Sequence, residues 1–375
     1  MGVYLDNAAT TSLDPEVLNA MIPYFTELYG NPSSQHSVGR SVRSAIEDAR
    51  KKIAHLINAQ PGDIVFTSGG TESNNTILKG AVRDLGVKHI IISAIEHHCV
   101  SHTVEYLEKT GQIKLTVLPV DENGKVMISE LEKALADSKE KTLVSLIHAN
   151  NEIGIMIDID QVAHICKSYG AYFHSDTVQT FAHYHLDVQK TPIDFISAAA
   201  HKFHGPKGVG FFYMRKTAKV QASIHGGSQE RSMRAGTENV AGIIGLTKAA
   251  QIAYENLSQD KAHIQSLKSY LIEKIKTEMP EVGFNGLLCD QSLYTVVSLS
   301  LPNHPMGSLL LFQLDMSGIC ASGGSACSSG ASMGSHVITA LGKAADRIPL
   351  RVSFSKYNTK EDIDFLVNTL MKLYE

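Results

Sequence analysis

The sequence predicts an α/β protein with a large domain built on a mostly parallel sheet and a smaller α+β domain at the C-terminus. Over most of the 375 residues, short runs rich in β-branched and aromatic residues alternate with helix-like patterns. This alternation is typical of a parallel sheet whose strands are joined by helices. After about residue 255 the pattern changes to a long polar helix followed by strand-like runs. Hydrophobic residues make up 43% of the chain, so a substantial core can form.

Seven strands are expected in the large domain, each a short apolar run that ends in polar or glycine-rich sequence. These runs are 63–68, 89–94, 113–120, 142–149, 171–176, 194–199 and 208–214. Helix patterns lie between them, for example at 129–137 and 158–170. The second pattern ends at Gly170, a residue type that often terminates a helix.

The C-terminal part combines a helix pattern over 258–279 with strand patterns over 294–301 and 350–355. We therefore expect a large domain at 13–255. The small domain is expected to comprise 1–12 together with 256–375.

The overall composition restricts the classes of partner and the cellular compartment. A net charge of −4 does not favour nucleic acid or an anionic membrane as a partner. No apolar run approaches the roughly 18 residues that a membrane-spanning helix needs. The first residues lack the pattern of a signal peptide, so we expect a cytoplasmic protein whose five cysteines are reduced thiols.

The segment 67–75, TSGGTESNN, lies between a predicted strand and a predicted helix. Gly69 and Gly70 permit a tight turn and a close approach of the backbone to a ligand. Thr71 can cap the helix, and a helix N-terminus with a hydroxyl group is suited to binding phosphate. A capped turn without a ligand is the alternative.

Asp176 ends another predicted strand, and Gln179 follows three residues later. A carboxylate at this position can pair with a protonated ring nitrogen, as in sites for pyridoxal phosphate. The alternative is that Asp176 is only the N-cap of a helix.

Lys202 lies between a small apolar run and the glycine-rich turn GPKG, directly after His201. One interpretation is a surface lysine at the start of a loop. The other is an amine that forms a Schiff base with a carbonyl cofactor. With the phosphate turn and Asp176, this lysine predicts a pyridoxal phosphate site.

Further polar residues follow other strands or lie in loops. His97 follows the strand at 89–94, and Asn151 follows the strand at 142–149. A glycine-rich loop contains Arg231, Arg234 and Thr237 and could bind an anion. Each of these residues could equally be a loop polar group that is satisfied locally.

Cys320 and Cys327 belong to the segment CASGGSACSSGASMGS. Small residues surround Cys327, so its thiol can be reached, whereas Cys320 is expected to be a buried thiol at a strand end. No further Cys or His lies at ligand spacing, so we expect no metal site here.

Ten short segments of this chain occur in the same order in cysteine desulfurases. The chain therefore resembles these pyridoxal phosphate enzymes of the class V aminotransferase, fold-type I group from about residue 3 to about residue 372. The longer cysteine loop is most similar to that of the branch that serves iron–sulfur cluster assembly. The segments are YLDNAATT, NPSSQH, FTSGGTESNN, IEHH, HANNEIG, HSDTVQ, AHKFHGPKGVG, MRAGTENV, SGGSAC and LRVSFS.

The resemblance implies a fold-type I transferase and a role for each matching residue. It implies that Lys202 carries the cofactor, that His97 stacks on its ring and that Asp176 pairs with the pyridine nitrogen. Cys327 is the implied nucleophile, and His97 is the candidate to take its thiol proton. The remaining implied roles are Gln179 for the ring oxygen, Gly70, Thr71 and His201 for the phosphate, Thr237 for the phosphate of the neighbouring subunit of a homodimer, and Asn31, Asn151 and Arg351 for the substrate, with Asn151 also beside the cofactor.

One position departs from the pattern of the family. Ala199 occupies the place where the family commonly has a serine whose hydroxyl binds the phosphate. Loss of one neutral hydrogen bond corresponds to roughly 0.5–1.5 kcal/mol. We expect somewhat weaker cofactor binding but retained activity.

The activity implied by the resemblance is that of a cysteine desulfurase. Sulfur leaves L-cysteine to give L-alanine and a persulfide on Cys327, which passes to a sulfur-acceptor protein for iron–sulfur cluster assembly or for thiolation of tRNA or a cofactor. A selenocysteine lyase, or a related β-lyase or aminotransferase, is the alternative within the same chemistry. A non-enzymatic scaffold would be expected to have lost Lys202 or Cys327, and a nucleotide-binding module would need a different glycine pattern.

Overall fold

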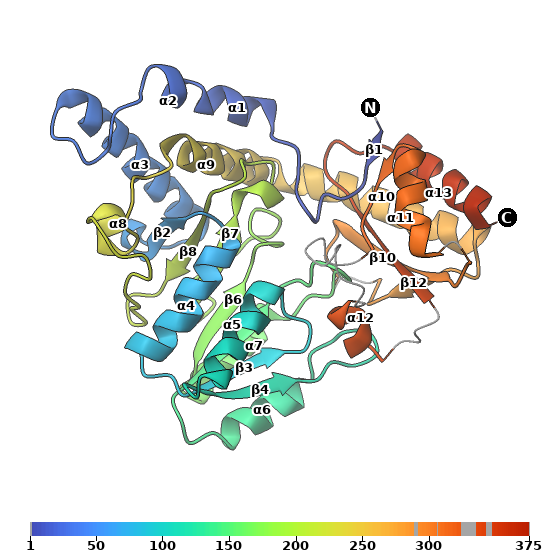
Figure 1. Ribbon diagram of the computed structural model, residues 1–375, viewed down its shortest axis with the longest axis horizontal. Coiled ribbons are helices and arrows are strands. Elements are labelled where there is room, and N and C mark those ends of the chain that lie inside the picture. Colours follow the sequence, from blue (N-terminus) through green and yellow to red (C-terminus); the bar gives the residue numbers. More distant parts are fainter. Residues whose placement is uncertain (1, 289–291, 306, 324–334, 343–346, 375) are drawn as a thin grey trace.

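The computed structural model describes residues 2–288, 292–305, 307–323, 335–342 and 347–374. A seven-stranded sheet with the order β2-β8-β7-β6-β5-β3-β4 forms the centre of the larger part (Figure 1). Within this sheet β8 runs antiparallel to both of its neighbours, and the other strands are parallel to one another. The prediction of a mostly parallel sheet is confirmed.

All seven strands expected in the large domain are present. They are β2 (Ile64–Thr67), β3 (His89–Ser93), β4 (Lys114–Leu118), β5 (Thr142–Ile147), β6 (Tyr172–Asp176), β7 (Phe195–Ala199) and β8 (Gly210–Met214).

Helices cover both faces of this sheet. Ile91 of β3 packs into a core that includes side chains of α3, α7 and α9, whereas Ile90 and Ile92 pack into a second core with α4 and α5. Successive side chains of a strand point to opposite faces, so one strand contributes to both cores. The helices of this part are α1 (Pro15–Met21), α2 (Pro23–Thr26), α3 (Ser37–Leu56), α4 (Gly70–Asp84), α5 (His98–Lys109), α6 (Ile128–Ala136), α7 (Ile159–Ser168), α8 (Gln229–Ser232) and α9 (Val240–Glu255).

The smaller part contains an antiparallel sheet with the order β12-β10-β9. Its separate core joins side chains of this sheet to those of α10, α11 and α13, and it includes Leu5. The predicted helix and the two predicted strands of this region are confirmed. The elements are β9 (Gly283–Asn285), β10 (Val296–Pro302), β12 (Arg347–Ser353), α10 (Leu257–Glu278), α11 (Leu310–Met316), α12 (His336–Ala340) and α13 (Lys360–Tyr374).

The N-terminal residues belong with this smaller part. β1 (Val3–Tyr4) pairs in parallel with β11 (Ile319–Cys320), and both chain ends lie beside the smaller part (Figure 1). We propose that the separate cores correspond to the domains at 13–255 and at 1–12 with 256–375. Among the described residues, no helix is both long enough and apolar enough to span a membrane.

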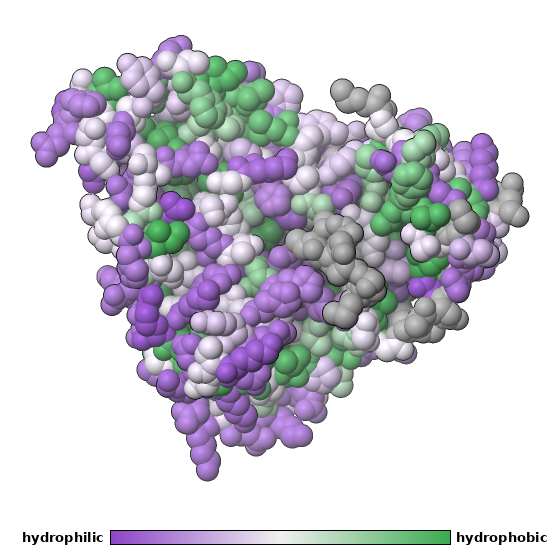
Figure 2. All heavy atoms as spheres, viewed as in Figure 1, coloured by the Kyte–Doolittle hydropathy of each residue, from purple (hydrophilic) through white to green (hydrophobic). Residues whose placement is uncertain are grey.

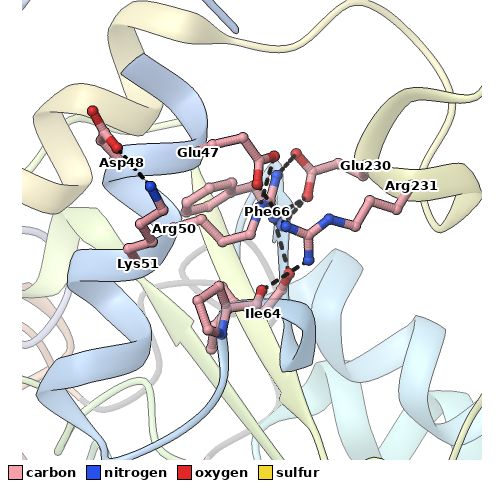
Figure 3. A network of polar contacts seen from close by, with 9 residues as sticks. Glu47, Asp48, Arg50, Lys51, Ile64, Phe66, Glu230 and Arg231 are labelled. Atoms are coloured by element: carbon pink, nitrogen blue, oxygen red, sulfur yellow. Dashed lines mark hydrogen bonds and ion pairs between the residues drawn. The ribbon is translucent and has the colours of Figure 1, made fainter. Parts of the chain in front are cut away.

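A buried ion pair fixes α3 to the edge of the large sheet (Figure 3). The guanidinium of Arg50 donates to both carboxylate oxygens of Glu230, at 2.7 and 2.8 Å, and to the carbonyl of Ile64 at 2.9 Å. Glu230 also accepts from the amide of Phe66 at 2.9 Å. Glu230 and the next two residues have positive φ angles of 47°, 56° and 65°, so the buried pair holds a left-handed turn in place.

Asp14 joins the beginning of α1 to the C-terminal part. Its Oδ1 accepts from the amide of Glu16 at 2.9 Å, and its Oδ2 accepts from Lys356 Nζ and the Tyr357 hydroxyl, both at 2.8 Å. Burial alone would raise the pKa of Asp14, but these hydrogen bonds outweigh it and lower the pKa to about 2. Asp14 is therefore ionised at neutral pH.

We expect Arg50→Met to lower the free energy of unfolding by about 3–5 kcal/mol, because it leaves the Glu230 carboxylate buried without its counter-ion. Lys51 is the control on the same helix, since it pairs with Asp48 at the surface at 3.1 Å. Lys51→Ala should cost less than about 1 kcal/mol. Urea unfolding of the two variants tests this, and equal losses would contradict it.

Asp14→Asn keeps a good N-cap residue but removes the charge that faces Lys356. We expect a loss of about 1–2 kcal/mol near neutral pH. A carboxylate with a lowered native pKa stabilises the fold above its unfolded pKa, and this stabilisation disappears as pH falls through the native pKa. The unfolding free energies of native protein and variant should therefore converge between about pH 4 and about pH 2. A difference independent of pH would contradict this.

Candidate active site

A cavity of about 210 Å³ lies where the carboxyl ends of the parallel strands meet. Parallel strands end at the same edge of a sheet, so polar residues that follow separate strands are brought together there. The cavity brings together nine of the predicted site residues: Gly70, Thr71, His97, Asn151, Asp176, Gln179, His201, Lys202 and Arg351. It is also lined by residues that the sequence did not single out, namely Ala8, Ala9, Cys99, Ile147 and Val178, and by Ala199.

The glycine turn after β2 forms one wall of the cavity. Gly69 has φ +152°, a conformation that side chains disfavour, and a Cβ on Gly70 would lie 2.7 Å from Val178 Cγ2. The turn therefore requires glycine at both positions. Thr71 lies inside the first turn of α4, and the N-cap is Gly69, so the expectation that Thr71 caps this helix is wrong. Its place at the helix N-terminus is still suited to an anion.

Asp176 is buried at the end of β6 and accepts two hydrogen bonds. Its Oδ1 accepts from the amide of Val178 at 2.9 Å, and its Oδ2 accepts from Asn74 Nδ2 at 2.7 Å. The residues after it form turns, so Asp176 is not the N-cap of an α-helix. Each of its two oxygens therefore accepts a hydrogen bond from the protein.

Lys202 lies in a short 3₁₀ turn, Ala200–Lys202, and points into the cavity rather than to the surface. Its Nζ donates to the carbonyls of Ala8 and Ala9 at 2.5 and 2.9 Å. Gln179 Nε2 donates to the same Ala8 carbonyl at 3.0 Å. The N-terminal segment thus supplies the acceptors that orient the lysine amine.

Arg351 brings a buried cation to the cavity from β12 of the smaller part. Its Nη2 donates to Asp6 at 2.7 Å and its Nη1 to the carbonyl of Asn151 at 2.9 Å. Among the described residues, its Nε has no hydrogen-bond partner. A buried donor left unpaired is costly, so this position is suited to a ligand that brings an acceptor such as a carboxylate.

His97 is the N-cap of α5, and the cap defines the protonation of its ring. Its Nδ1 accepts from the amide of Cys99 at 3.2 Å, so the proton of the neutral ring lies on Nε2. Burial lowers the pKa of His97, which favours the neutral ring. His201 is likewise neutral, because burial lowers its pKa to about 4.

Glu96 directly precedes this histidine in the chain and is buried. Burial raises its pKa to about 8, so the carboxyl is protonated at neutral pH. Its Oε1 accepts from the Ser93 hydroxyl at 2.5 Å and from the amide of Ile147 at 3.0 Å. Glu96 therefore adds no negative charge next to His97.

Three predicted site residues are not among those lining the cavity. Asn31 is exposed, and its Oδ1 accepts from the amide of Ser33 at 2.9 Å. Thr237 lines a separate cavity of about 240 Å³ together with Gly208 and Arg234. Cys327 lies outside the described residues.

The structure also tests the interpretations of the arginines in the glycine-rich loop and of Cys320. Arg231 and Arg234 pair with Glu47 and Glu72, so they are surface groups satisfied by carboxylates. The expectation that Cys320 is buried is wrong. β11 turns Ile319 inward and Cys320 outward, as alternation along a strand requires.

These residues could hold a phosphorylated pyridine aldehyde. An amine, a carboxyl group and a helix N-terminus with adjacent glycines face one cavity, and each matches one functional group of such a molecule. Among the described residues, no group of three or more His, Cys, Asp or Glu side chains could hold a metal ion.

Comparison with known proteins agrees with this geometry. The cysteine desulfurase IscS of Dictyoglomus turgidum is 44% identical over 377 residues, which cover 100% of this chain and 94% of that protein. The structure of a NifS-like protein has a TM-score of 0.91 at 38% identity, with 100% of both chains covered. The structure of SspA in complex with cysteine has a TM-score of 0.83 at 31% identity and covers 95% of this chain and 99% of that one.

The family model for class-V aminotransferases matches residues 3–366. This match covers nearly the whole chain, both parts of the fold and the residues that line the cavity. The chain therefore belongs to the class-V aminotransferase family.

Proposed function

We propose that the protein is a cysteine desulfurase that depends on pyridoxal phosphate and releases L-alanine from L-cysteine. The observation that carries this proposal is the meeting of Lys202, Asp176 and Arg351 in one cavity. Full-length relatives named cysteine desulfurase and a related structure with cysteine bound support it.

Each part of the cofactor has a proposed partner among the residues that line the cavity. Lys202 would bind its aldehyde, Asp176 its ring nitrogen, and Gly70, Thr71 and His201 its phosphate, with Gln179 beside the ring oxygen. When bound, pyridoxal phosphate supplies an electron sink that makes the bonds around the amino-acid Cα easier to break. Ala199 offers no hydroxyl, so the phosphate depends on the helix N-terminus and His201.

Arg351 is the proposed partner of the substrate carboxylate. Its Nε has no partner among the residues that the structure describes, and its guanidinium is buried, so it can form a charge-assisted hydrogen bond with a carboxylate. Asn151 lies next to it, since its carbonyl already accepts from Arg351. Binding the carboxylate there directs the rest of the amino acid toward Lys202.

Two side chains are placed to move protons. The Lys202 amine can take the Cα proton of the substrate at Nζ once it is released from the aldehyde. His97 is the expected acceptor of the Cys327 thiol proton, but its Nδ1 is engaged by the helix cap. In this state the neutral ring offers only a hydrogen bond from Nε2–H, because loss of that proton would leave an imidazolate. His97 can therefore take the thiol proton only when its Nδ1 is released from the helix cap.

The proposed sulfur acceptor is Cys327. Its thiolate attacks the sulfur of the substrate, a sulfur–sulfur bond forms and the carbon–sulfur bond breaks. The electron pair of the broken bond remains on carbon, which takes a proton and leaves as alanine. The persulfide would then pass to an acceptor protein of iron–sulfur cluster assembly or of a thiolation pathway.

A homodimer is part of the proposal. Thr237 lies away from the cavity of its own chain, which agrees with a role at the site of a second subunit. Apolar side chains gather over α1 and α2 (Figure 2), where Leu18, Ile22 and Phe25 are 45%, 45% and 64% exposed. Exposed apolar clusters of this kind often mark protein interfaces.

Cys327→Ser should abolish the formation of alanine from L-cysteine while the protein still binds pyridoxal phosphate, because only the sulfur acceptor is lost. Cys320→Ser is the matched control, an exposed thiol seven positions earlier in the chain, and should leave activity unchanged. Alanine and sulfide are quantified with L-cysteine and a reductant. Turnover by Cys327→Ser would favour the selenocysteine lyase, β-lyase or aminotransferase alternative.

Arg351→Met should raise KM for L-cysteine by roughly tenfold to a hundredfold, the effect of losing a hydrogen bond to a charged group. Arg351→Lys keeps the charge but not the planar donor set, so its KM should lie between those of the native protein and Arg351→Met. Steady-state kinetics and a thermal unfolding curve of each variant separate binding from folding. A loss of kcat with unchanged KM would contradict the assignment of Arg351 to the substrate carboxylate.

A further inference from the structure

A buried chain of hydrogen bonds connects Asp176 to His97 through two residues that have no assigned role. Asn74 lies on α4 and Cys99 on α5, and the two site residues that they contact, Asp176 and His97, both line the cavity. Asn74 and Ser197 are completely buried. Buried polar side chains of this kind are retained only where their hydrogen bonds are satisfied.

The orientation of the Asn74 amide is defined by Ser197 on β7. The Ser197 hydroxyl donates to Asn74 Oδ1 at 2.5 Å, so the NH₂ group faces the opposite way. One of its protons lies toward Asp176 Oδ2 at 2.7 Å and the other toward Cys99 Sγ at 3.1 Å. The amide therefore uses both of its donors within the site.

The Cys99 thiol connects Asn74 to His97 by hydrogen bonds. Its Sγ lies 2.9 Å from His97 Nδ1, and this nitrogen already accepts the backbone cap, so the thiol hydrogen is the proton that lies between them. Burial raises the pKa of Cys99 to about 12, which keeps this hydrogen in place at neutral pH. Cys99 is thus a donor to His97 and an acceptor from Asn74.

We propose that Asn74 and Cys99 are positioning residues that hold Asp176 as an acceptor for the cofactor ring nitrogen and His97 in its Nε2-protonated form. This inference rests on the proposed function and adds a connection between Asp176, the proposed partner of the ring nitrogen, and His97, which is expected to stack on the ring. The Asn74 amide donates a hydrogen bond to Oδ2 of Asp176. The Cys99 thiol donates to Nδ1 of His97, so the proton of the neutral ring stays on Nε2.

The pKa of His97 gives a readout that needs no turnover. Besides burial, Asp176 on β6 raises this pKa, and Lys202, His336 on α12 and His102 on α5 lower it. A donor at Nδ1 also opposes protonation there. Removing the thiol donor should therefore raise the His97 pKa by about half to one unit, since a neutral hydrogen bond has an effect of this order.

The experiment compares Cys99→Ala, Cys99→Ser and Cys166→Ala in the cofactor-free protein. Cys166 is a buried thiol on α7 away from the cavity and controls for the loss of a thiol from a core. Histidine-labelled protein is titrated by NMR, with the His97 signal assigned by its absence in His97→Gln. We expect a raised pKa in Cys99→Ala and native values in Cys99→Ser and Cys166→Ala. An unchanged pKa in Cys99→Ala would overturn the role of Cys99.

Asn74→Leu tests the other half of the chain through the affinity of the cofactor-free protein for pyridoxal phosphate. Removing one donor to a buried carboxylate should weaken binding by roughly tenfold or more. Ser197→Ala is the second variant, for the case that Asn74→Leu does not fold. It changes the side-chain volume little but removes the hydroxyl that orients the Asn74 amide, so it should weaken cofactor binding by a smaller factor. Native affinity in Ser197→Ala and in a folded Asn74→Leu would overturn the inference. Failure of the native protein to bind the cofactor would instead overturn the proposed function.

Discussion

The carboxylate of Asp176, buried at the carboxyl end of β6, is the constraint on which the rest of the site depends. A buried charge is tolerated only with hydrogen bonds and a nearby cation. The backbone of the following turn and the Asn74 amide supply the hydrogen bonds. The strand order of the parallel sheet then brings Lys202, which follows the adjacent strand β7, to the same edge. An acid and an amine in one cavity are what an aldehyde on a pyridine ring requires.

The N-terminal segment joins this acid–amine arrangement to the smaller part of the fold. Ala8 and Ala9 offer their carbonyls to Lys202, while Asp6 pairs with Arg351 at 2.7 Å. Asp14 then binds Lys356. One short stretch of chain therefore orients the amine, supports the buried arginine and links the two hydrophobic cores. The geometry of the cavity depends on the relative placement of both parts.

Local patterns were sufficient to predict the strands and the polar residues at their ends. The sequence singles out Lys202, Asp176 and the glycine turn because each follows an apolar run that indicates a buried strand. The carbonyls of Ala8 and Ala9 could not be found in this way, since any residue has a carbonyl. Asn74 and Cys99 lie inside amphipathic helices, where a single polar residue has no distinctive spacing. Their roles depend on contacts between α4, α5 and β6, which the packing of the sheet determines.

The measurement that tests the central claim most directly locates the sulfur after one turnover. Protein loaded with pyridoxal phosphate is given an equimolar amount of L-cysteine without reductant, alkylated, cleaved and mapped by mass spectrometry. The account predicts one additional sulfur atom on the peptide that contains Cys327. Sulfur on the peptide that contains Cys99, the thiol that lines the cavity, would contradict both the assignment of the nucleophile and the positioning role of Cys99.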